Sequence, residues 1–568
     1  VNEDLRTRGL IYKDEELPHN VPVCWRCSTR LYYAPLDAWF VDIQQLKPVM
    51  RKTNEKINWF PKHFKHGRFL KSLEAAPDWN ISRNRYWGSP VPVWECDKCH
   101  DRFVPGSIAE LEKASGSKIE DLHKPEIDNI KIKCKQCGNQ ASRTPEVLDS
   151  WIEAGSAAFA ERHFPFNKSE ELEDFFPPDF IVEYTGQIRA WFYVLHAIGA
   201  ALYKSMAFKN VAVTGVILGT DGRKMSKNLH NYPDPKEMIG KYGGDALRLY
   251  LLGSPVMNGE DMLISEEPYR NQVRGTLLIL WNVYNFFISN ALVDKWSPTK
   301  AARESKNILD RWILSRLNGS IKNIVEIGYE VFNTPQVVSQ TSIFIDDLSL
   351  WYLRRSRERV GPVAHDQKDK NNFYKTMHSV LVEYCKVLAP LIPFITEAIY
   401  KNLTREESVH LSDFPKANNK LINKKLEEEM IMARKIVELA HAKRKESGIK
   451  VRQPLAKLKV KSEKLKVNED LVNLIKDEIN VKQVVFEKGK GEMSVSLDTK
   501  LTDALREEGI AREIVREIQK QRKILGTTLD EKVDVTLESW PKEFEEDIKK
   551  KAMVANLQKG PKFTVTRK

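Results

Sequence analysis

The chain has 568 residues, which is too many for one hydrophobic core, so three or four domains are expected. Hydrophobic residues make up 42% and charged residues 30%, and the chain lacks a run of about 18 uncharged apolar residues, which argues against a membrane span. The formal charge of +12 and the isoelectric point near 9.0 fit either a polyanionic partner or a basic solvated surface. The chain begins with Val1 and shows no secretory signal, so we expect a trimmed or partial cytoplasmic protein.

The first half of the chain predicts a mixed α/β structure. Residues 61–270 alternate strand-like and helix-like segments, which is typical of a parallel sheet. Residues 180–184 are predicted to form a buried strand, 187–204 a helix, and 210–218 a second strand closed by a glycine-containing turn.

The second half changes character. Helical patterns dominate from residue 271 to about 402, for example over 308–324 and 344–359, and predict a helix bundle. After a polar linker at 403–425, a small separate α/β domain is expected, with helices at 426–445 and 503–524 and strands at 455–460, 481–486 and 533–537.

Two cysteine pairs have the spacing of a metal site. Cys96/Cys99 and Cys134/Cys137 supply four thiolates, a set that suits tetrahedral Zn²⁺. A shell of four thiolates leaves no position for water, so the predicted zinc is structural. His100 is adjacent and could compete as a ligand.

A third pair, Cys24/Cys27, has no second free pair in this chain. It is either half of a second metal site, with its partner pair upstream, or two ordinary thiols. In a large chain without an export signal, metal thiolates explain three Cys-x-x-Cys pairs better than disulfides do, which favours a reducing compartment.

Two lysines bracket a serine in Gly222-Arg-Lys-Met-Ser-Lys227, after the predicted strand 210–218. Such a cationic loop can stabilise charge that develops on a transferring phosphoryl group and its pyrophosphate leaving group. The same pattern is common on exposed loops, so the surrounding sequence must decide between these interpretations.

Arg223-Lys-Met-Ser-Lys-Asn228, followed by Asn231-Tyr-Pro-Asp-Pro235, closely resembles the lysine–serine–lysine loop of class I aminoacyl-tRNA synthetases. Other segments resemble the isoleucine-specific branch of this family in the same order: 78–88, 148–155, 183–192, 244–248, 346–357, 409–415, 450–455 and 510–518. The resemblance covers nearly the whole chain. It implies a multidomain α/β plus α protein with a partial Rossmann-like catalytic domain, an inserted zinc module, a helical-bundle anticodon-binding domain and a small C-terminal α/β domain.

The resemblance also implies domain boundaries. The tail of an editing insertion would occupy 1–60, the second half of the catalytic domain 61–270 with its zinc module at about 91–145, the anticodon-binding domain and linker 271–425, and a tRNA-contacting domain 426–568.

The chemistry implied by the resemblance is the reaction of isoleucine with ATP, accompanied by Mg²⁺, to give an aminoacyl-adenylate and pyrophosphate, followed by transfer to tRNA(Ile). Lys224 and Lys227 would stabilise the triphosphate in the transition state, while Ser226 would hold phosphate and the Met225 backbone adenine.

The remaining pocket residues follow from the same resemblance. Glu183 and Gln187, at the end of a predicted strand, match positions that contact the adenylate. Trp151 and Trp191 match the aromatic walls of the amino-acid pocket; the alternative for each indole is ordinary core packing.

The chain departs from the family pattern in three places. It contains no His-x-Gly-His motif; His196-Ala-Ile-Gly199 lacks the second histidine and lies in a predicted helix. Asn228 replaces the usual final serine, and Gly186 stands where many relatives carry Asp. Glu153-Ala154 replaces the more usual Asp-Ser. Without the His-x-Gly-His half of the ATP site, we expect this chain alone to be inactive.

Two basic segments are candidates for tRNA contact. Arg354, Arg355 and Arg357 follow Trp351 and Tyr352, and rings and guanidinium planes can stack on unpaired bases. On one helix these residues cannot all face the same side, so some must be core or ion-paired.

The second basic segment spans 443–452 and includes Lys450 and Arg452, with a solvated face as its alternative. The resemblance thus implies a monomeric ligase of the isoleucine-specific branch, without a membrane partner. A non-catalytic tRNA- and zinc-binding chain, or a valine- or leucine-type ligase, are the alternatives.

Overall fold

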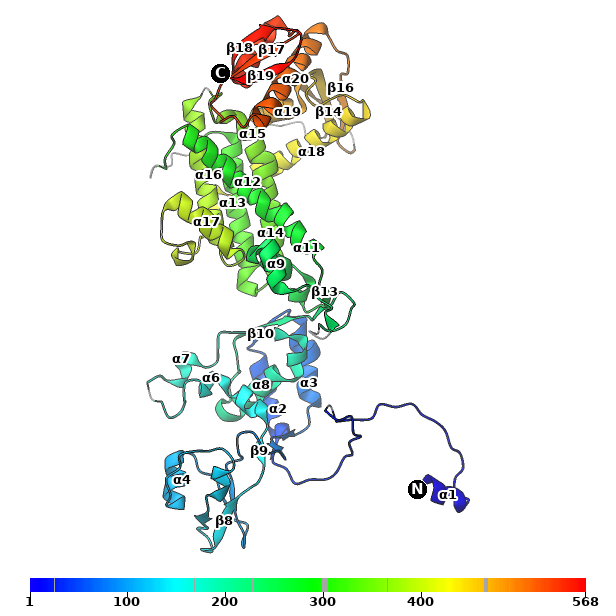
Figure 1. Cartoon of the computed structure of the whole chain (residues 1–568), viewed down its shortest axis with the longest axis vertical. Coiled ribbons are helices and arrows are strands. Elements are labelled where there is room, and N and C mark those ends of the chain that lie inside the picture. Colours follow the sequence, from blue (N-terminus) through cyan, green and yellow to red (C-terminus); the bar gives the residue numbers. More distant parts are fainter. Residues whose placement is uncertain are drawn as a thin grey trace. The chain divides into compact units, whose positions relative to one another are not determined.

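The computed structural model describes residues 1–24, 26–167, 169–225, 229–298, 305–364, 366–463, 468–489 and 491–568 (Figure 1). The chain forms two compact units that interleave along the sequence. The first unit comprises 1–57, 65–179 and 187–209, and the second comprises 58–64, 180–186 and 210–568.

Helix α8 (Trp191–Tyr203) is the apolar centre of the first unit, since its 13 residues include no charged side chain. It packs against α2 (Ile43–Asn54) and α5 (Ser150–Gly155). A Cβ atom on Gly155 would lie 2.6 Å from Ile198 Cδ1, so glycine allows the close approach of α5 and α8. The predicted helix 187–204 is therefore confirmed from Trp191 onward, preceded by a 3-10 turn at Thr185–Arg189.

Short elements complete this part of the first unit. Two antiparallel pairs of two-residue strands, β1–β3 and β4–β9, join segments that are far apart in sequence. The elements are α1 (Asn2–Thr7), β1 (Phe40–Val41), the π-helical turn Lys65–Phe69, α3 (Leu70–Ala75), β3 (Trp79–Asn80), β4 (Ser82–Arg83), β9 (Val147–Leu148), α6 (Ala157–Ala160) and α7 (Leu172–Phe175).

A small antiparallel module holds the two cysteine pairs. Its sheet has the order β6-β5-β8-β7, and one short helix and a 3-10 turn accompany it. Trp94, Leu111, Ile127 and Ile132 are buried with Cys96 and Cys134 in a core of its own. The elements are β5 (Trp94–Cys96), β6 (Arg102–Phe103), α4 (Ile108–Ser115), the 3-10 turn Glu126–Asn129, β7 (Ile132–Lys133) and β8 (Gln140–Arg143).

The second unit begins with the predicted parallel sheet, which is confirmed. The expected burial of strand 180–184 is wrong, since only Ile181 of its five residues is buried. Strand β11 (Asn210–Thr214) lies between β10 (Phe180–Tyr184) and β2 (Asn58–Phe60), and both pairings are parallel. The strand predicted over 210–218 is broken. Gly215 donates its N–H to Val256 O, and a Cβ on Gly215 would lie 1.9 Å from Glu260 O, so the backbone turns there against a later loop.

The rest of the broken strand, β12 (Ile217–Leu218), pairs in parallel with β13 (Met262–Leu263). Helices α9 (Pro235–Tyr242), α10 (Gly244–Leu252) and α11 (Glu267–Gln272) follow the loop that contains the lysines. Among the described residues, one helical stretch, Glu267–Val293, is long and apolar enough to cross a membrane by length and composition alone, a criterion that core helices of soluble proteins also meet.

The helices between residues 278 and 404 share one continuous core with the segment that follows. Helix α13 (Ile308–Glu326) packs against α14 (Thr334–Asp346) and α16 (Gln367–Leu388), and α16 packs against α17 (Pro393–Thr404). The helix α12 spans Leu278–Val293. The single helix predicted over 344–359 is instead the end of α14, a π-helical turn at Asp347–Leu353, the short α15 (Arg354–Ser356) and a 3-10 turn at Arg357–Arg359.

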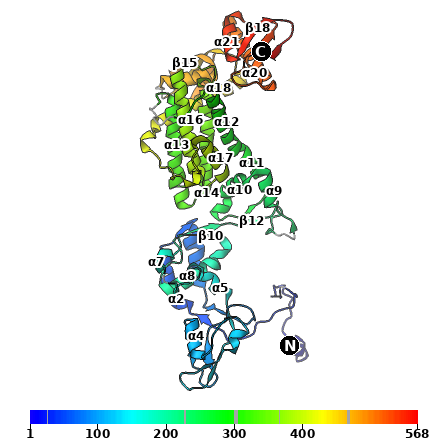
Figure 2. The same cartoon turned by 60° about the vertical axis from the view of Figure 1, so that its left-hand side comes forward.

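The C-terminal region contains two small mixed sheets, β15-β14-β16 and β18-β17-β19, with every predicted strand present (Figure 1 and Figure 2). The long helix α20 (Asp503–Ile524) matches its predicted bounds. The other elements are α18 (Lys424–Glu446), β14 (Leu455–Ser462), α19 (Glu469–Ile479), β15 (Val481–Lys488), β16 (Ser494–Leu497), β17 (Val533–Leu537), α21 (Glu545–Lys551), β18 (Val554–Lys559) and β19 (Thr564–Arg567).

Candidate nucleotide loop, metal centre and basic surfaces

The loop between β12 and α9 is held at its base by two polar side chains. The buried Asn231 amide donates to Asp221 Oδ1 at 2.8 Å and to Lys224 O at 3.3 Å. Asp221 also accepts from the Arg223 N–H at 3.0 Å and from its guanidinium at 2.7 Å. These hydrogen bonds, the one from Asn231 foremost, lower the pKa of Asp221 to about 2. Sequence reasoning missed both residues, although Asn231 lies inside the loop motif.

One of the two predicted cations, Lys224, follows this base in the loop. Lys224 and Met225 are exposed, and within the described part of the chain Lys224 Nζ makes no ion pair, so it is available to an anion. Ser226, Lys227 and Asn228 lie outside the described residues. The structure therefore leaves the roles of Lys224, Met225, Ser226 and Lys227 as predictions.

At the carboxyl end of β10, Glu183 is exposed and its Oε2 accepts the Tyr184 N–H at 3.0 Å. The Tyr184 ring folds over Gly186, where a Cβ atom would lie 2.4 Å from the ring. An aspartate at 186 would therefore displace Tyr184, which gives a local reason for the glycine at this position.

In the first unit, the two predicted pocket tryptophans lie on helices in contact, α5 and α8. Trp191 Nε1 donates to Ala154 O at 3.0 Å, one turn after Trp151, and the Trp191 N–H donates to Gln187 Oε1 at 3.0 Å. Trp151 is 36% exposed, so core packing does not account for that indole. Gln187 caps the start of α8, and its contact with an adenylate stays a prediction.

His196, in the segment that falls short of the missing motif, is fully buried in α8. Its Nε2 lies 2.8 Å from Met50 O and 3.2 Å from Thr53 Oγ1. Burial lowers the pKa of His196 to about 4, so the ring is neutral and structural rather than a phosphate ligand.

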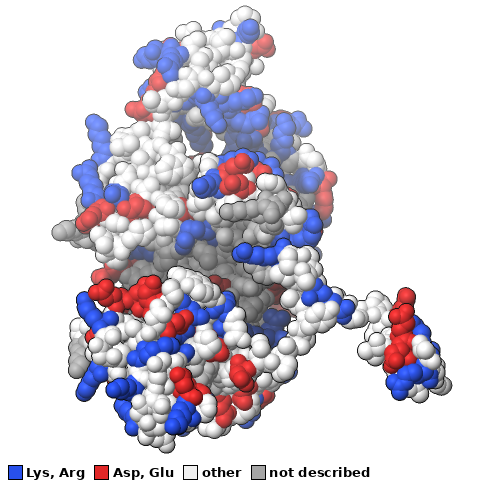
Figure 3. Space-filling view, turned by 60° about the horizontal axis from the view of Figure 1, so that its bottom comes forward, with Lys and Arg blue, Asp and Glu red and all other residues white. Residues whose placement is uncertain are grey.

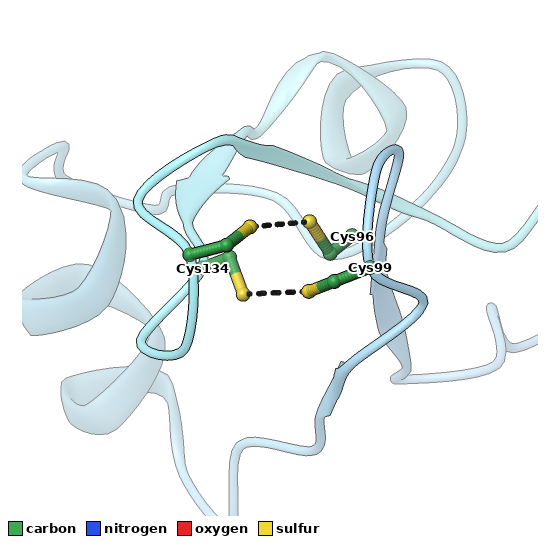
Figure 4. Close-up of side chains that lie close together, drawn as sticks. Cys96, Cys99 and Cys134 are labelled. Carbon is green, nitrogen blue, oxygen red and sulfur yellow. Dashed lines mark hydrogen bonds between the residues drawn. The ribbon is translucent and has the colours of Figure 1, made fainter.

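The four cysteines of the module converge (Figure 4). The Sγ atoms of Cys96 and Cys137 are 3.5 Å apart, as are those of Cys99 and Cys134, and all four lie within 4.8 Å of one another. Zinc–sulfur bonds of about 2.3 Å in a tetrahedron place sulfurs about 3.8 Å apart, so the donor set fits Zn²⁺. His100 is exposed and its Nδ1 lies 3.1 Å from Glu95 Oε1, away from a ligand role.

The two cysteine turns have matching backbone geometry. The N–H of Cys96 donates to Asp101 O and that of Cys134 to Asn139 O, at 2.9 and 2.8 Å. The residue after each pair, His100 or Gly138, has positive φ, 59° and 73°.

The third pair has the same turn. The Cys24 N–H donates to Thr29 O and the Ser28 N–H to Cys24 O, both at 2.8 Å, and Ser28 has φ of 57°. Cys24 and Cys27 are thus arranged like the pairs that form the four-cysteine cluster. This geometry supports the half-site interpretation over two unrelated thiols.

Of the two alternatives for the aromatic residues of the first basic segment, the structure shows core packing. Trp351 is 6% exposed and Tyr352 fully buried, and their polar atoms bond to Met430 Sδ and Asp310. Their positions in the π-helical turn direct both rings into the helical core.

The arginines of the same segment are engaged in ion pairs. Arg354 and Arg355 both contact Glu478, whose side chain is only 2% exposed; Arg355 Nε lies 2.8 Å from Glu478 Oε2. An RNA role for Arg354 and Arg355 stays a prediction and would compete with these pairs.

In the second basic segment, Lys450 is exposed, and Arg452 is about half exposed and 3.8 Å from Glu513. Arg444 is not part of a solvated strip: it is 1% exposed and donates to the carbonyls of Lys450, Gln453 and Asn480.

On the face drawn in Figure 3, basic and acidic side chains are interspersed, so the positive charge is not concentrated in one patch there.

Comparison with known proteins agrees with these features. Residues 7–263 match the model of the class I tRNA synthetases for I, L, M and V, and residues 310–461 match the anticodon-binding domain of tRNA ligases. The chain belongs to the class I tRNA synthetases.

Within that family, relatives at about 40% identity are isoleucine–tRNA ligases. The enzyme of Treponema denticola is 40% identical over 512 residues, 87% of this chain and 46% of the relative. That of Chlamydia abortus is 42% identical over 493 residues, 86% of this chain and 47% of the relative. The chain thus spans about half the length of the curated relatives it matches. A methionyl-tRNA synthetase from Mycobacterium tuberculosis, solved with methionyl-adenylate, aligns with a TM-score of 0.49 and 14% identity over 68% of this chain and 66% of its own.

Proposed function

We propose that the full-length gene product is an isoleucine–tRNA ligase, which activates isoleucine with ATP and transfers it to tRNA(Ile). The observation that carries this proposal is the 40–42% identity with isoleucine–tRNA ligases over 86–87% of the chain. The family model includes the synthetases for four different amino acids, so it supports the aminoacylation reaction but not the choice of isoleucine as the substrate.

In the first step, the isoleucine carboxylate attacks the α-phosphorus of ATP, forming isoleucyl-adenylate and releasing pyrophosphate. Lys224 and Lys227 would balance the charge that builds on the leaving pyrophosphate, which Mg²⁺ accompanies. Met225 and Ser226 would hold adenine and phosphate. The exposure of Lys224 to solvent supports its part in this assignment.

Glu183 and Gln187 are proposed to contact the adenylate, and Trp151 and Trp191 to wall the isoleucine side chain. Flat indoles form an apolar surface that suits a branched aliphatic group. The helix contact that fixes Trp191 against Ala154 supports a rigid wall.

Zinc is proposed to be structural and bound by Cys96, Cys99, Cys134 and Cys137, with Cys24 and Cys27 as half of a second site. A four-thiolate site offers no open position for a substrate or water. The packing of Cys96 and Cys134 in the core of the module supports this role.

The proposed partners are tRNA(Ile), isoleucine and ATP, for a monomeric cytoplasmic protein without a membrane partner. Residues 271–425 would bind the anticodon arm, and residues 426–568 would make further tRNA contacts, with Lys450 and Arg452 as candidates. The anticodon-binding model over residues 310–461 supports an anticodon-binding role for the first segment, and it continues past residue 425 into the second.

Charging of tRNA(Ile) transcript by the full-length gene product, with isoleucine, valine and leucine supplied in parallel, tests the proposal. We expect rapid charging with isoleucine and at least about tenfold weaker stable charging with either competitor. Preferential charging with valine or leucine would reassign the specificity. Binding of tRNA without charging would leave only a tRNA- and zinc-binding role.

A further inference from the structure

Strand β14 carries lysines on one face only. Its residues alternate between buried Leu458 and Val460 and the outward Lys457, Lys459 and Lys461. Side chains on one face of a strand repeat every second residue, so successive lysines are about 6.6–6.8 Å apart. Because β14 is the central strand of its sheet, the lysines form a row along the middle of that sheet.

The neighbouring strands continue this face mainly with polar residues; Val485 of β15, which lies beside Lys459, is the apolar exception. In the observed register, Lys457 lies beside Gln483 and Lys459 beside Ser496, while Lys461 lies beside Ser494. Gln483, Ser494 and Ser496 are exposed, and each can donate or accept a hydrogen bond.

One acidic residue breaks the pattern. Glu487 lies beside Lys461 in the register, and its carboxylate is 3.4 Å from the Lys459 ammonium. Both side chains are still accessible, at 50% for Lys459 and 37% for Glu487. The exposed ion pair contributes little to stability, so the strand does not require these lysines in order to fold.

The opposite face of the sheet is already occupied. Leu458 and Val460 are completely buried, and Val484, Phe486 and Leu497 pack on the same core. Helices α18 and α19 contact the sheet and supply that cover (Figure 1). The sheet therefore has one sealed face and one open, lysine-bearing face.

The chemistry of the open face fits a phosphodiester backbone rather than bases. Lysines are compact point charges that neutralise phosphates, and hydroxyl and amide groups hydrogen-bond to sugars and phosphates. Base stacking uses aromatic rings, and none of the residues of β14, β15 and β16 that face outward is aromatic. The face is suited to contacts that do not depend on sequence.

We infer that this open face, formed by Lys457, Lys459, Lys461, Gln483, Ser494 and Ser496, binds the phosphate backbone of RNA. That the RNA is a tRNA rests on the proposed function. The contact is distinct from the candidates Arg354, Arg355, Lys450 and Arg452, which lie outside this sheet.

The test measures the affinity of the 568-residue chain for a labelled tRNA(Ile) transcript by fluorescence anisotropy. The affinity is measured from about 50 to 200 mM KCl, a range over which binding through phosphate contacts weakens steeply. The test variant is Lys457→Gln/Lys459→Gln/Lys461→Gln. The control is Lys520→Gln/Lys542→Gln/Lys550→Gln, which removes the same charge from exposed lysines elsewhere in the C-terminal region. A Lys→Arg triple at the sheet positions and thermal unfolding of each variant separate charge from folding.

Because the test variant removes three phosphate-binding cations, its affinity at 100 mM salt should fall about ten- to hundredfold and its salt slope by about 2. The control should stay within about twofold, the arginine triple should retain binding, and Glu487→Gln should tighten it. Equal reductions of affinity in test and control, or no binding by the native chain, would overturn the inference. Loss of binding to phosphatidylglycerol vesicles with tRNA binding retained would assign the face to a membrane instead. The binding assay contains neither ATP nor isoleucine. A loss of tRNA binding at this face can therefore be distinguished from a failure of the charging reaction.

Discussion

Asn231 and Asp221 are joined by a 2.8 Å hydrogen bond. This bond closes the base of the loop that carries Lys224. The amide is buried, while the carboxylate also takes the Arg223 N–H, so one asparagine fixes both ends of the turn. A Cβ on Gly219 would lie 2.3 Å from the Asn231 amide nitrogen, which explains why glycine occupies that position.

Replacing Asn231 with alanine should destabilise the loop, because a buried polar partner is removed from Asp221 and from Lys224 O. The expected cost is about 1–3 kcal/mol, read from thermal unfolding. Asn231→Asp should cost more than Asn231→Ala, since two carboxylates would then face each other. The exposed Asn419→Ala serves as the control and should have no effect. Equal stability of all three variants would show that the contact does not hold the loop.

Zinc removal should unfold the module around Trp94 while leaving the second unit folded. Free thiols cannot replace a tetrahedral metal as the link between β5 and β7, so Cys96→Ser should reduce zinc content by about one ion per chain. Hydrogen exchange over β5 and β8 should then become rapid. Cys385→Ser changes the buried lone cysteine and should keep the metal. Full zinc retention by Cys96→Ser would contradict the site.

The first unit should lose stability in mild acid through His196. In the folded chain burial lowers the pKa of His196 to about 4, against about 6.5 when unfolded. Below pH 6.5 the unfolded chain takes up a proton that the folded chain rejects, so stability is full above about pH 6.5 and declines toward pH 4.

The decline should be on the order of 3 kcal/mol in total. The measurement is urea unfolding at a series of pH values, followed through hydrogen exchange of the α8 amides. In the His196→Gln variant, the pH dependence of the unfolding free energy over this range should flatten. An unchanged slope would mean that other groups cause the pH dependence.

Local patterns in the sequence predicted much of this fold. Apolar content identified strand Phe180–Tyr184, though not its exposure, and the spacing of apolar residues predicted α20 at its observed bounds. The four-cysteine cluster followed from spacing alone, because each turn is built by adjacent residues.

The broken strand and the alternatives that the sequence left open have a common physical cause. The break in strand 210–218 depends on Gly215 meeting Glu260, and the burial of Trp351 depends on Met430, contacts between residues far apart in sequence. The pairing of Arg354 and Arg355 with Glu478 likewise joins distant segments. No local pattern encodes such partners.

The most direct test of the central claim is isoleucine-dependent ATP–pyrophosphate exchange by the full-length gene product with Lys224→Ala. If the Lys224 ammonium stabilises the leaving pyrophosphate, kcat should fall about 10²–10³-fold with unchanged thermal stability, because the side chain is exposed. Lys236→Ala, a neighbouring exposed lysine on α9, should retain nearly full activity. Exchange by Lys224→Ala within about twofold of the native enzyme would contradict the account.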